Sequence, residues 1–309
     1  MGIKNFNKFI HIFNKAESIP VFCQLRIDCL PLFFRNISWI NKDKGKLDFK
    51  QTLSNVKLDI NNIINLVGLN SKIDKVFLHF DGVAPKQKKL TQIKRRSTWK
   101  LNYTNYITLL KSNLKELGYN VIVCGESEFE MFYNRNIELP TILYSIDSDL
   151  LVLSALYEKK TSNDCVYVMN DFLYDTTINL SINRDSLILI FILLGTDFNN
   201  SIITPSMAKE LMINRLDYVI NSKETLEQCL FELLKLLCGK KIRLPKNNDG
   251  IEDYDKISDN IFWTFNYYNN YNVDVNFSYH YKINGLKYLN YIVKKYQQMF
   301  DSIQDFLKY

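Results

Sequence analysis

Short runs of β-branched and aliphatic residues alternate with segments of helical periodicity through the first two-thirds of the chain. The strand-like runs are residues 21–27, 75–80, 120–124, 141–146 and 165–169. Amphipathic patterns with helical spacing separate them, notably at residues 53–67, 88–117 and 149–159. Strands that alternate with helices favour a mainly parallel central sheet flanked by helices, so the pattern predicts an α/β fold.

After about residue 200 the strand signal fades. Helical patterns remain near residues 206–215, 225–237 and 285–307. Between the last two lies a polar segment rich in Asn, Asp and Tyr, residues 246–276, which we expect to form a long surface loop. We therefore expect an α/β domain over residues 1–200 and a helical C-terminal region over residues 201–309.

The composition is that of a folded globular protein. Of 309 residues, 47% are hydrophobic and 14% aromatic, which is enough to bury a full core. The most apolar stretch, residues 187–195, is too short to span a bilayer, and the N-terminus does not resemble a signal peptide. The six cysteines form no CxxC pair, and several lie in apolar runs. We expect a soluble intracellular protein with no membrane partner and with reduced thiols.

The formal net charge is +6, and its source is concentrated in one segment. Between residues 86 and 100 there is no acid, and the bases are Lys86, Lys88, Lys89, Lys94, Arg95, Arg96 and Lys100. Without these seven charges the rest of the chain carries about one net negative charge. The concentration fits an element that binds nucleic-acid phosphates. A solvated helix face is the alternative that charge alone leaves open.

Almost every strand-like run stops at a carboxylate. The acids at these element ends are Asp28, Asp81, Glu126, Glu128, Asp147, Asp149 and, after the apolar run 187–194, Asp197. One such acid is ordinary turn or capping chemistry, but convergence of five element ends is hard to explain that way. Because parallel strands end at one edge of a sheet, the seven side chains are expected to gather there.

Gathered carboxylates repel each other and need cations between them. With only three histidines in the chain, the ligands are oxygen atoms, which suit Mg²⁺ or Mn²⁺. Two such ions ~4 Å apart activate a water and neutralise a scissile phosphate. The pattern thus predicts a site for two Mg²⁺ ions, with Mn²⁺ as a substitute, that hydrolyses phosphodiester bonds.

Six short motifs carry a family resemblance. They are MGIKNF at 1–6, IDC at 27–29, FDG at 80–82, GESE at 125–128, IDSD at 146–149 and LGTDF at 194–198. In order and spacing they resemble those of the flap endonuclease / 5′–3′ exonuclease superfamily. The resemblance covers residues 1–200 and implies a PIN-like 5′ nuclease catalytic domain with a short basic arch at about residues 86–117.

The resemblance also implies roles for the acids. The ligands of one metal would be Asp28, Asp81, Glu126 and Glu128, and those of the other Asp147, Asp149 and Asp197, some through water. Of these, Asp81 and Asp149 are the acids on which we expect cleavage to depend most directly.

For the scissile phosphate, the resemblance implies contacts from Lys88 and Arg95, which their seven-residue spacing places on one helix face. The other five bases of the 86–100 run would bind nucleic acid. Phe34 occupies the place of an aromatic that stacks on a nucleobase, although a core aromatic is the open alternative. Gly2 would pass close to the site, where a side chain would not fit.

Two departures from the family bear on the substrate. Only 44 residues separate Asp81 from Glu126, which leaves room for a basic helix but little cap, so a short or open gateway is expected. After Asp197 the glycine-rich helix–turn–helix of the family is missing, so a K⁺ site is unsupported.

DNA is the favoured substrate, with RNA as the alternative. The string DGVAPK at 81–86 reads closer to the 5′–3′ exoribonuclease branch, but the chain is far shorter than those enzymes. It is similar in size to compact members of the superfamily from large DNA viruses. This resemblance implies replication or repair proteins as partners, and a location in the nucleus or at a cytoplasmic viral replication site. No sliding-clamp motif is visible in residues 297–309. A catalytically inactive scaffold is the lesser alternative.

Overall fold

The computed structural model describes residues 3, 5–40, 48–82, 103–147, 149–155, 164–170, 172–178, 184–196 and 201–213. The chain forms two compact units. The first comprises Phe13–Ile178 together with Met1, and the second comprises Gly2–Ile12 and Asn179–Tyr309.

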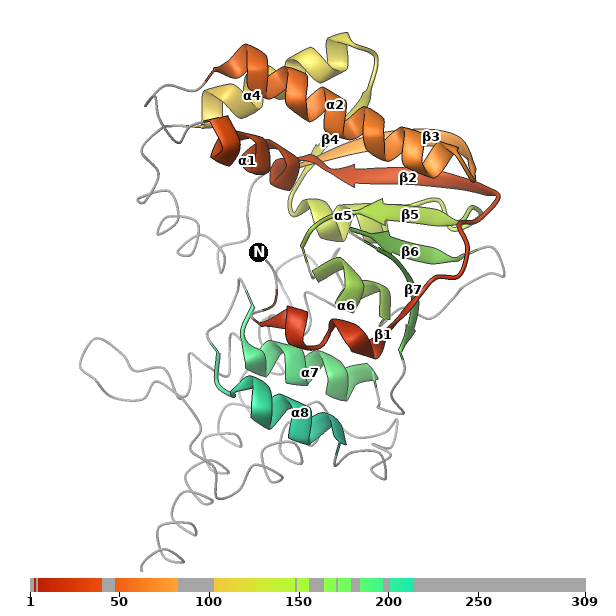
Figure 1. Cartoon of the computed structure of the whole chain (residues 1–309), viewed down its shortest axis with the longest axis vertical. Helices are drawn as coiled ribbons and strands as arrows, with labels where there is room; N and C mark the ends of the chain where they lie inside the picture. The colour runs from red at the N-terminus through yellow and green to blue at the C-terminus, as the bar shows by residue number, and fades with distance from the viewer. Residues whose placement is uncertain are drawn as a thin grey trace, which may run out of the picture. The chain divides into compact units, whose positions relative to one another are not determined.

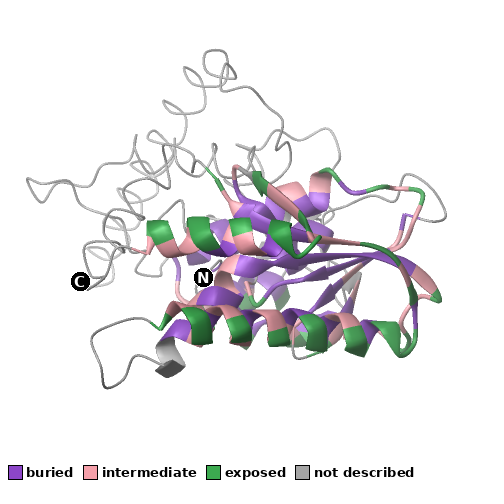
Figure 2. Cartoon of the chain, turned by 90° about the horizontal axis from the view of Figure 1, so that it is seen from above, coloured by how far each residue is buried: buried purple, intermediate pink, exposed green. Residues whose placement is uncertain are grey.

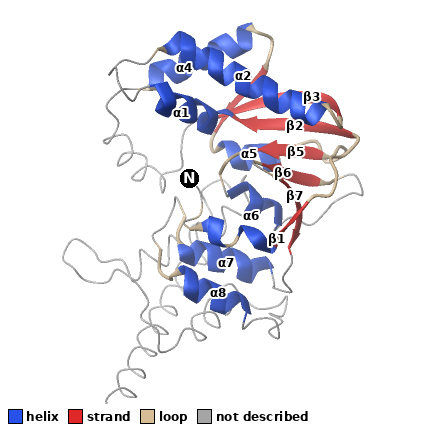
Figure 3. Cartoon of the chain, viewed as in Figure 1, coloured by secondary structure: helices blue, strands red, loops and turns tan. Residues whose placement is uncertain are grey.

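A seven-stranded sheet forms the centre of the first unit (Figures 1 and 3). Its strands are β1 (Phe13–Lys15), β2 (Phe22–Asp28), β3 (Lys72–Asp81), β4 (Asn120–Cys124), β5 (Thr141–Tyr144), β6 (Val166–Met169) and β7 (Leu173–Ile178). Their spatial order is β1-β7-β6-β5-β2-β3-β4. The five strands from β2 to β6 run parallel, and β7 is antiparallel to β6 and to β1. The predicted α/β fold with a mainly parallel sheet is confirmed.

The helices cover the two faces of the sheet in the order that the connections dictate. From β2 to β4 the chain builds the sheet in one direction, and α1 (Cys29–Ile40), α2 (Phe49–Gly68) and α4 (Thr104–Glu116) lie on one face. It then returns through β5 and β6, with α5 (Ser127–Tyr133) and α6 (Asp149–Ala155) on the other face. Right-handed crossovers require this change of face when the direction reverses.

The larger core lies under α1, α2 and α4. Alternate residues of β2, Cys23, Leu25 and Ile27, are fully buried there together with Val56 and Ile60 of α2. The i, i+4 spacing of the α2 pair places both on the sheet side of the helix, whereas its outer face is exposed (Figure 2). The opposite alternation of β2 points Gln24, Arg26 and Asp28 away from this core, toward α5.

Within the second unit, two short helical turns near the N-terminus pack on a helix from the middle of the chain. These are η1 (Phe6–Lys8) and η2 (Ile10–Ile12), and the helix is α7 (Arg184–Leu194). The ring centroids of Phe6 and Phe9 lie 5.4 and 5.9 Å from that of Phe191. Another helix, α8 (Pro205–Ile213), follows α7 in the chain.

Several predictions for the C-terminal region lie outside the described residues. They are the helices at 225–237 and 285–307 and the loop at 246–276, and the domain boundary near residue 200 also stays a prediction. The helix predicted near 206–215 corresponds to α8.

No helix in the described part of the chain is long and apolar enough to cross a membrane.

Candidate metal centre

The carboxyl ends of four parallel strands meet at one edge of the sheet, and acids follow each of them. Asp28 and Asp81 are the last residues of β2 and β3, Glu126 follows β4, and Asp147 follows β5. The chain leaves β2 toward β3 on one side and later returns to β5 on its other side. Asp28 therefore lies at the topological switch point of the sheet, where α/β proteins place their sites.

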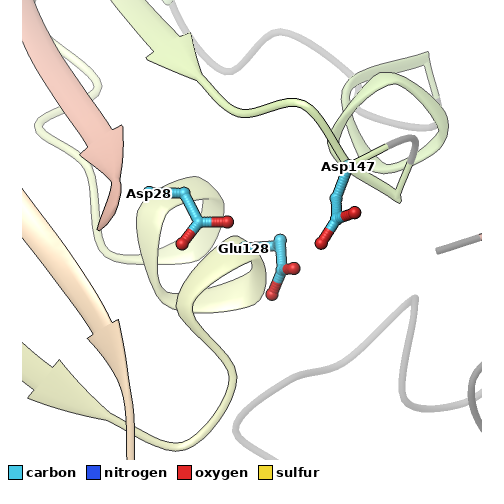
Figure 4. A group of neighbouring side chains, drawn as sticks. All are labelled: Asp28, Glu128 and Asp147. Carbon is cyan, nitrogen blue, oxygen red and sulfur yellow. The ribbon is translucent and has the colours of Figure 1, made fainter. Parts of the chain in front are cut away.

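Five acids form two overlapping groups. The first carboxylate group is Asp28, Glu128 and Asp147 (Figure 4), and the second carboxylate group is Asp81, Glu126 and Glu128. In each group one oxygen of every residue lies within 4.8 Å of the others. Glu128 belongs to both groups. Asp147 thus lies with Asp28 and Glu128, although the family resemblance implies that Asp147 belongs to the ligand set of the other metal.

Backbone hydrogen bonds place Glu126 and Glu128 beside the strand ends. Glu126 precedes α5 with an extended backbone, and its carbonyl accepts the amide of Glu130 at 3.1 Å. Asp81 Oδ1 accepts the backbone amide of Ser127 at 2.9 Å, so the end of β3 caps this helix. The amide of Gly82 donates to the carbonyl of Gly125 at 3.0 Å, which joins the loops after β3 and β4.

Two serine hydroxyls hold the Asp28 carboxylate. Ser127 Oγ donates to Asp28 Oδ1 at 3.1 Å, and Ser145 Oγ donates to Asp28 Oδ2 at 3.0 Å. Ser145 Oγ also accepts the backbone amide of Asp147 at 3.1 Å. Sequence reasoning missed both serines, although each stands at an element end within two residues of a predicted ligand, and that position was the available signal.

Three of the five acids of the site are buried, and Asp81 and Asp147 are partly exposed. Asp28 and Glu126 are each 1% exposed, and Glu128 is 6% exposed. Burial raises the pKa of Asp28 well above its usual range, and the charges of Glu128 and Asp81 raise it further. The hydrogen bonds from Ser145 and Ser127 act in the opposite direction. A buried set of mutually repelling carboxylates with only oxygen donors fits hard divalent cations such as Mg²⁺ and Mn²⁺.

A lysine that the sequence reasoning did not single out lies beside the site. Lys111 of α4 donates from Nζ to the backbone carbonyl of Asp81 at 3.2 Å, and its Nζ lies 5.4 Å from the centroid of the Phe80 ring. It brings a positive charge next to the second carboxylate group. Its signal in the sequence was weak, because a single basic residue on an amphipathic helix is usually a solvated one.

Behind the carboxylates, the polar face of β2 contacts the far end of α5. Arg26 Nη2 donates to the carbonyl of Asn134 at 2.7 Å, and Gln24 Nε2 donates to the carbonyl of Asn136 at 2.7 Å. A guanidinium at the C-terminal carbonyls of a helix is favourable for the helix dipole. The nitrogens Arg26 Nη1 and His79 Nε2 lie 3.4 Å apart. Burial, and then the charge of Arg26, lower the pKa of His79 to about 3.

Several predicted site residues lie outside the described residues. They are Gly2, the seven bases of the 86–100 run, and Asp197. Asp149 begins α6, but the described side chains do not include its own. The roles expected for all of these residues stay predictions.

Phe34 is half-buried in α1. Its ring meets those of Phe33 and Tyr103 edge-on, with centroids 5.4 and 5.8 Å away, and it packs against the core under this helix. These contacts are those of the core aromatic that was its alternative interpretation, and stacking on a nucleobase stays a prediction.

No protein-family model matches the sequence, and no curated protein matches it. Among solved structures, the chain is similar to the catalytic core of Rad2 in complex with DNA substrate. Two such complexes give TM-scores of 0.54 and 0.53 at 15% sequence identity, over 96% of this chain and 95% of that chain. Human GEN1 in complex with Holliday junction DNA gives a TM-score of 0.47 at 18% identity, over 93% of this chain and 77% of that chain. The chain has the fold of the Rad2 catalytic core, which confirms the fold that the motifs predicted.

Proposed function

We propose that the chain is a divalent-metal-dependent, structure-specific 5′ nuclease that hydrolyses phosphodiester bonds in DNA during replication, repair or recombination. One observation carries the proposal. Two groups of three carboxylates share Glu128 and lie at the switch-point edge of a sheet. A fold gains no stability from burying acids that repel each other, so their use is to bind cations.

The chain's own residues hold the cations in this proposal. The first carboxylate group would hold one Mg²⁺ and the second another, with Mn²⁺ as a substitute. Asp149 and Asp197 would be further ligands, as the family resemblance implies. When bound, the ions supply Lewis acidity that neutralises the scissile phosphate and lowers the pKa of a bound water. Ser127 orients Asp28 through its hydroxyl and Asp81 through its amide.

The basic run 86–100 binds the substrate in this proposal. Lys88 and Arg95 contact the scissile phosphate, where they stabilise the charge that develops as the bond breaks. The other bases of the run bind the backbone of the substrate, Phe34 stacks on a base and Gly2 leaves room beside the cut. The Rad2 core was solved with DNA substrate, which supports DNA for this chain. RNA is the second candidate substrate, because the sequence DGVAPK at residues 81–86 resembles the 5′–3′ exoribonuclease branch.

A panel of three substrates tests the proposal: a 5′-flap DNA, a blunt duplex DNA and a 5′-phosphorylated RNA, each with Mg²⁺, Mn²⁺ or EDTA. We expect cleavage of the flap DNA with either metal and none in EDTA. Asp28→Asn should abolish it, whereas Asp74→Asn, which removes one charge from an exposed position of β3, should not.

The other outcomes are equally informative. Preferential cleavage of the RNA would favour the exoribonuclease-like alternative. A wild-type chain that binds these substrates but cuts none of them with either metal contradicts the nuclease proposal and leaves the scaffold alternative.

A further inference from the structure

Both oxygens of the Asp28 carboxylate are contacted by buried hydroxyls. Ser127 comes from α5 and Ser145 from the residue after β5, and each is only 1% exposed. A carboxylate oxygen has two lone-pair directions. With one direction on each oxygen taken by a hydroxyl, Asp28 offers one remaining direction per oxygen to a cation, and its rotation is blocked from both sides.

The same hydroxyls reach the other members of the first carboxylate group. Ser145 Oγ accepts the amide of Asp147 at 3.1 Å, and Ser127 Oγ lies 3.4 Å from Glu128 Oε2. The second carboxylate group is contacted differently, because Asp81 accepts the backbone amide of Ser127. Replacement of Ser145 by alanine therefore removes contacts to the first group alone. Replacement of Ser127 by alanine removes its hydroxyl contacts to Asp28 and to the shared Glu128, and it keeps the amide contact to Asp81.

We propose that Ser127 and Ser145 are positioning residues that hold Asp28, Glu128 and Asp147 in the geometry for one of the two cations. The proposal rests on the proposed function. Three carboxylates within 4.8 Å repel each other, and hydroxyl donors from two different elements oppose that repulsion before any cation arrives. Both serines act through Asp28 and touch no reacting atom.

A purely structural role predicts something else. A buried hydroxyl that only satisfies its own hydrogen bond contributes to folding and leaves cation affinity alone. Ser154 supplies the matched control, because it is fully buried and its hydroxyl donates to the carbonyl of Leu151 at 2.9 Å. Its hydrogen bond joins no carboxylate.

Mn²⁺ binding to the full chain without nucleic acid tests the proposal. Free Mn²⁺ is measured by electron paramagnetic resonance, and the bound-ion spectrum reports ligand symmetry. For Ser145→Ala we expect one of two Mn²⁺ affinities to fall about 10-fold or more, the size typical of outer-shell partners, with the other unchanged. For Ser127→Ala we expect the same affinity to fall by a similar factor and the other to fall less, because Glu128 is shared by both groups. Ser145→Thr keeps a hydroxyl and should restore the affinity, and Ser154→Ala should bind like wild type.

Unchanged affinities and an unchanged spectrum in both alanine variants overturn the positioning role while leaving the nuclease proposal intact. A wild-type chain that binds no Mn²⁺ overturns both. The two serines lie on different elements, so either variant tests the role if the other does not fold. Denaturant unfolding in EDTA identifies any loss of stability and separates it from a loss of affinity.

Discussion

The carboxylate of Asp81 accepts a hydrogen bond from the backbone amide of Ser127, with 2.9 Å between Oδ1 and N. The last residue of β3 therefore caps the first turn of α5, whose own N-cap residue, Glu126, makes no side-chain cap. Asp81 thus has a structural task in addition to its place in the second carboxylate group.

Two substitutions at Asp81 separate these tasks. Asp81→Asn keeps an oxygen acceptor for the Ser127 amide, whereas Asp81→Ala removes it, and both remove the charge. We expect both to lose cleavage, and the alanine variant to unfold in EDTA with a free energy about 1 kcal/mol lower than the asparagine variant. Urea denaturation measures the difference. Equal free energies of unfolding would show that the cap contributes nothing.

The raised pKa of Asp28 makes the stability of the metal-free chain depend on pH. Because the folded-state pKa is raised, protonated Asp28 stabilises the fold fully below its unfolded pKa of about 4. That stabilisation is lost as the pH rises through the raised pKa. In EDTA, the free energy of unfolding of wild type should therefore fall with rising pH relative to Asp28→Asn. Parallel pH profiles for the two proteins would contradict the raised pKa.

His79 produces the opposite trend. Burial and the charge of Arg26 lower its pKa to about 3, and its Nδ1 has no hydrogen-bond partner among the described residues. The unfolded chain takes up a proton below about pH 6.5, so stability present above that pH is lost as the pH falls toward 3. His79→Gln should flatten this loss in a series of urea denaturations. Observation of a charged His79 ring at pH 5 by NMR would refute the prediction.

Arg26 and Arg35 form a matched pair of arginines. Arg26 is 5% exposed and donates to the Asn134 carbonyl, whereas the Arg35 side chain is 40% exposed in its ion pair with Asp59. Arg26→Met removes the donor to the Asn134 carbonyl and the buried donor to Gln24 Oε1, and should cost on the order of 2 kcal/mol or more. Arg35→Met should cost less than about 1 kcal/mol. Similar losses in chemical denaturation would mean that Arg26 does not hold α5 as described.

Substitutions in the basic run 86–100 distinguish an effect on the rate of cleavage from an effect on the affinity for the substrate. Lys88→Ala or Arg95→Ala should slow single-turnover cleavage by about 100-fold at saturating chain concentration. Loss of affinity alone, with the rate of bound substrate unchanged, would contradict that role. Neutralising Lys94, Arg96 and Lys100 together should instead weaken binding and flatten its salt dependence. Lys72→Ala, at the opposite end of β3 from the site, serves as the control.

The sequence predicts the elements whose pattern is local. The runs at β2 to β6 and the helix α2 carry their own periodicity, so the sheet and its acid-bearing edge follow from it. The neighbouring strands β1 and β7 were not predicted from the sequence. β1 has only three residues, and its pairing with β7 joins Phe13 to Ile178, so the contact that makes both of them strands lies far away in the sequence.

The arrangement of the acids within the site was harder to predict from the sequence. Which acids share a group depends on how α5 lies against β2 and β5, and a seven-residue helix leaves little periodicity to detect. Asp147 joins Asp28 because Ser145 links them, and a serine after a strand looks like ordinary turn chemistry until its partner is known. Positions of acids were predictable, and partnerships between them were not.

The acids of the two carboxylate groups follow the ends of strands β2 to β5 or lie in the first turn of α5, and this placement bears on how the sequence can vary. Among the described residues, the strands β1, β7 and β6 on one side of the sheet supply no acid to either group. The geometry of the two groups therefore depends on residues at a few element ends and places fewer requirements on the sequences of β1, β6 and β7. The same fold can accordingly occur in this chain and in the Rad2 core at 15% sequence identity.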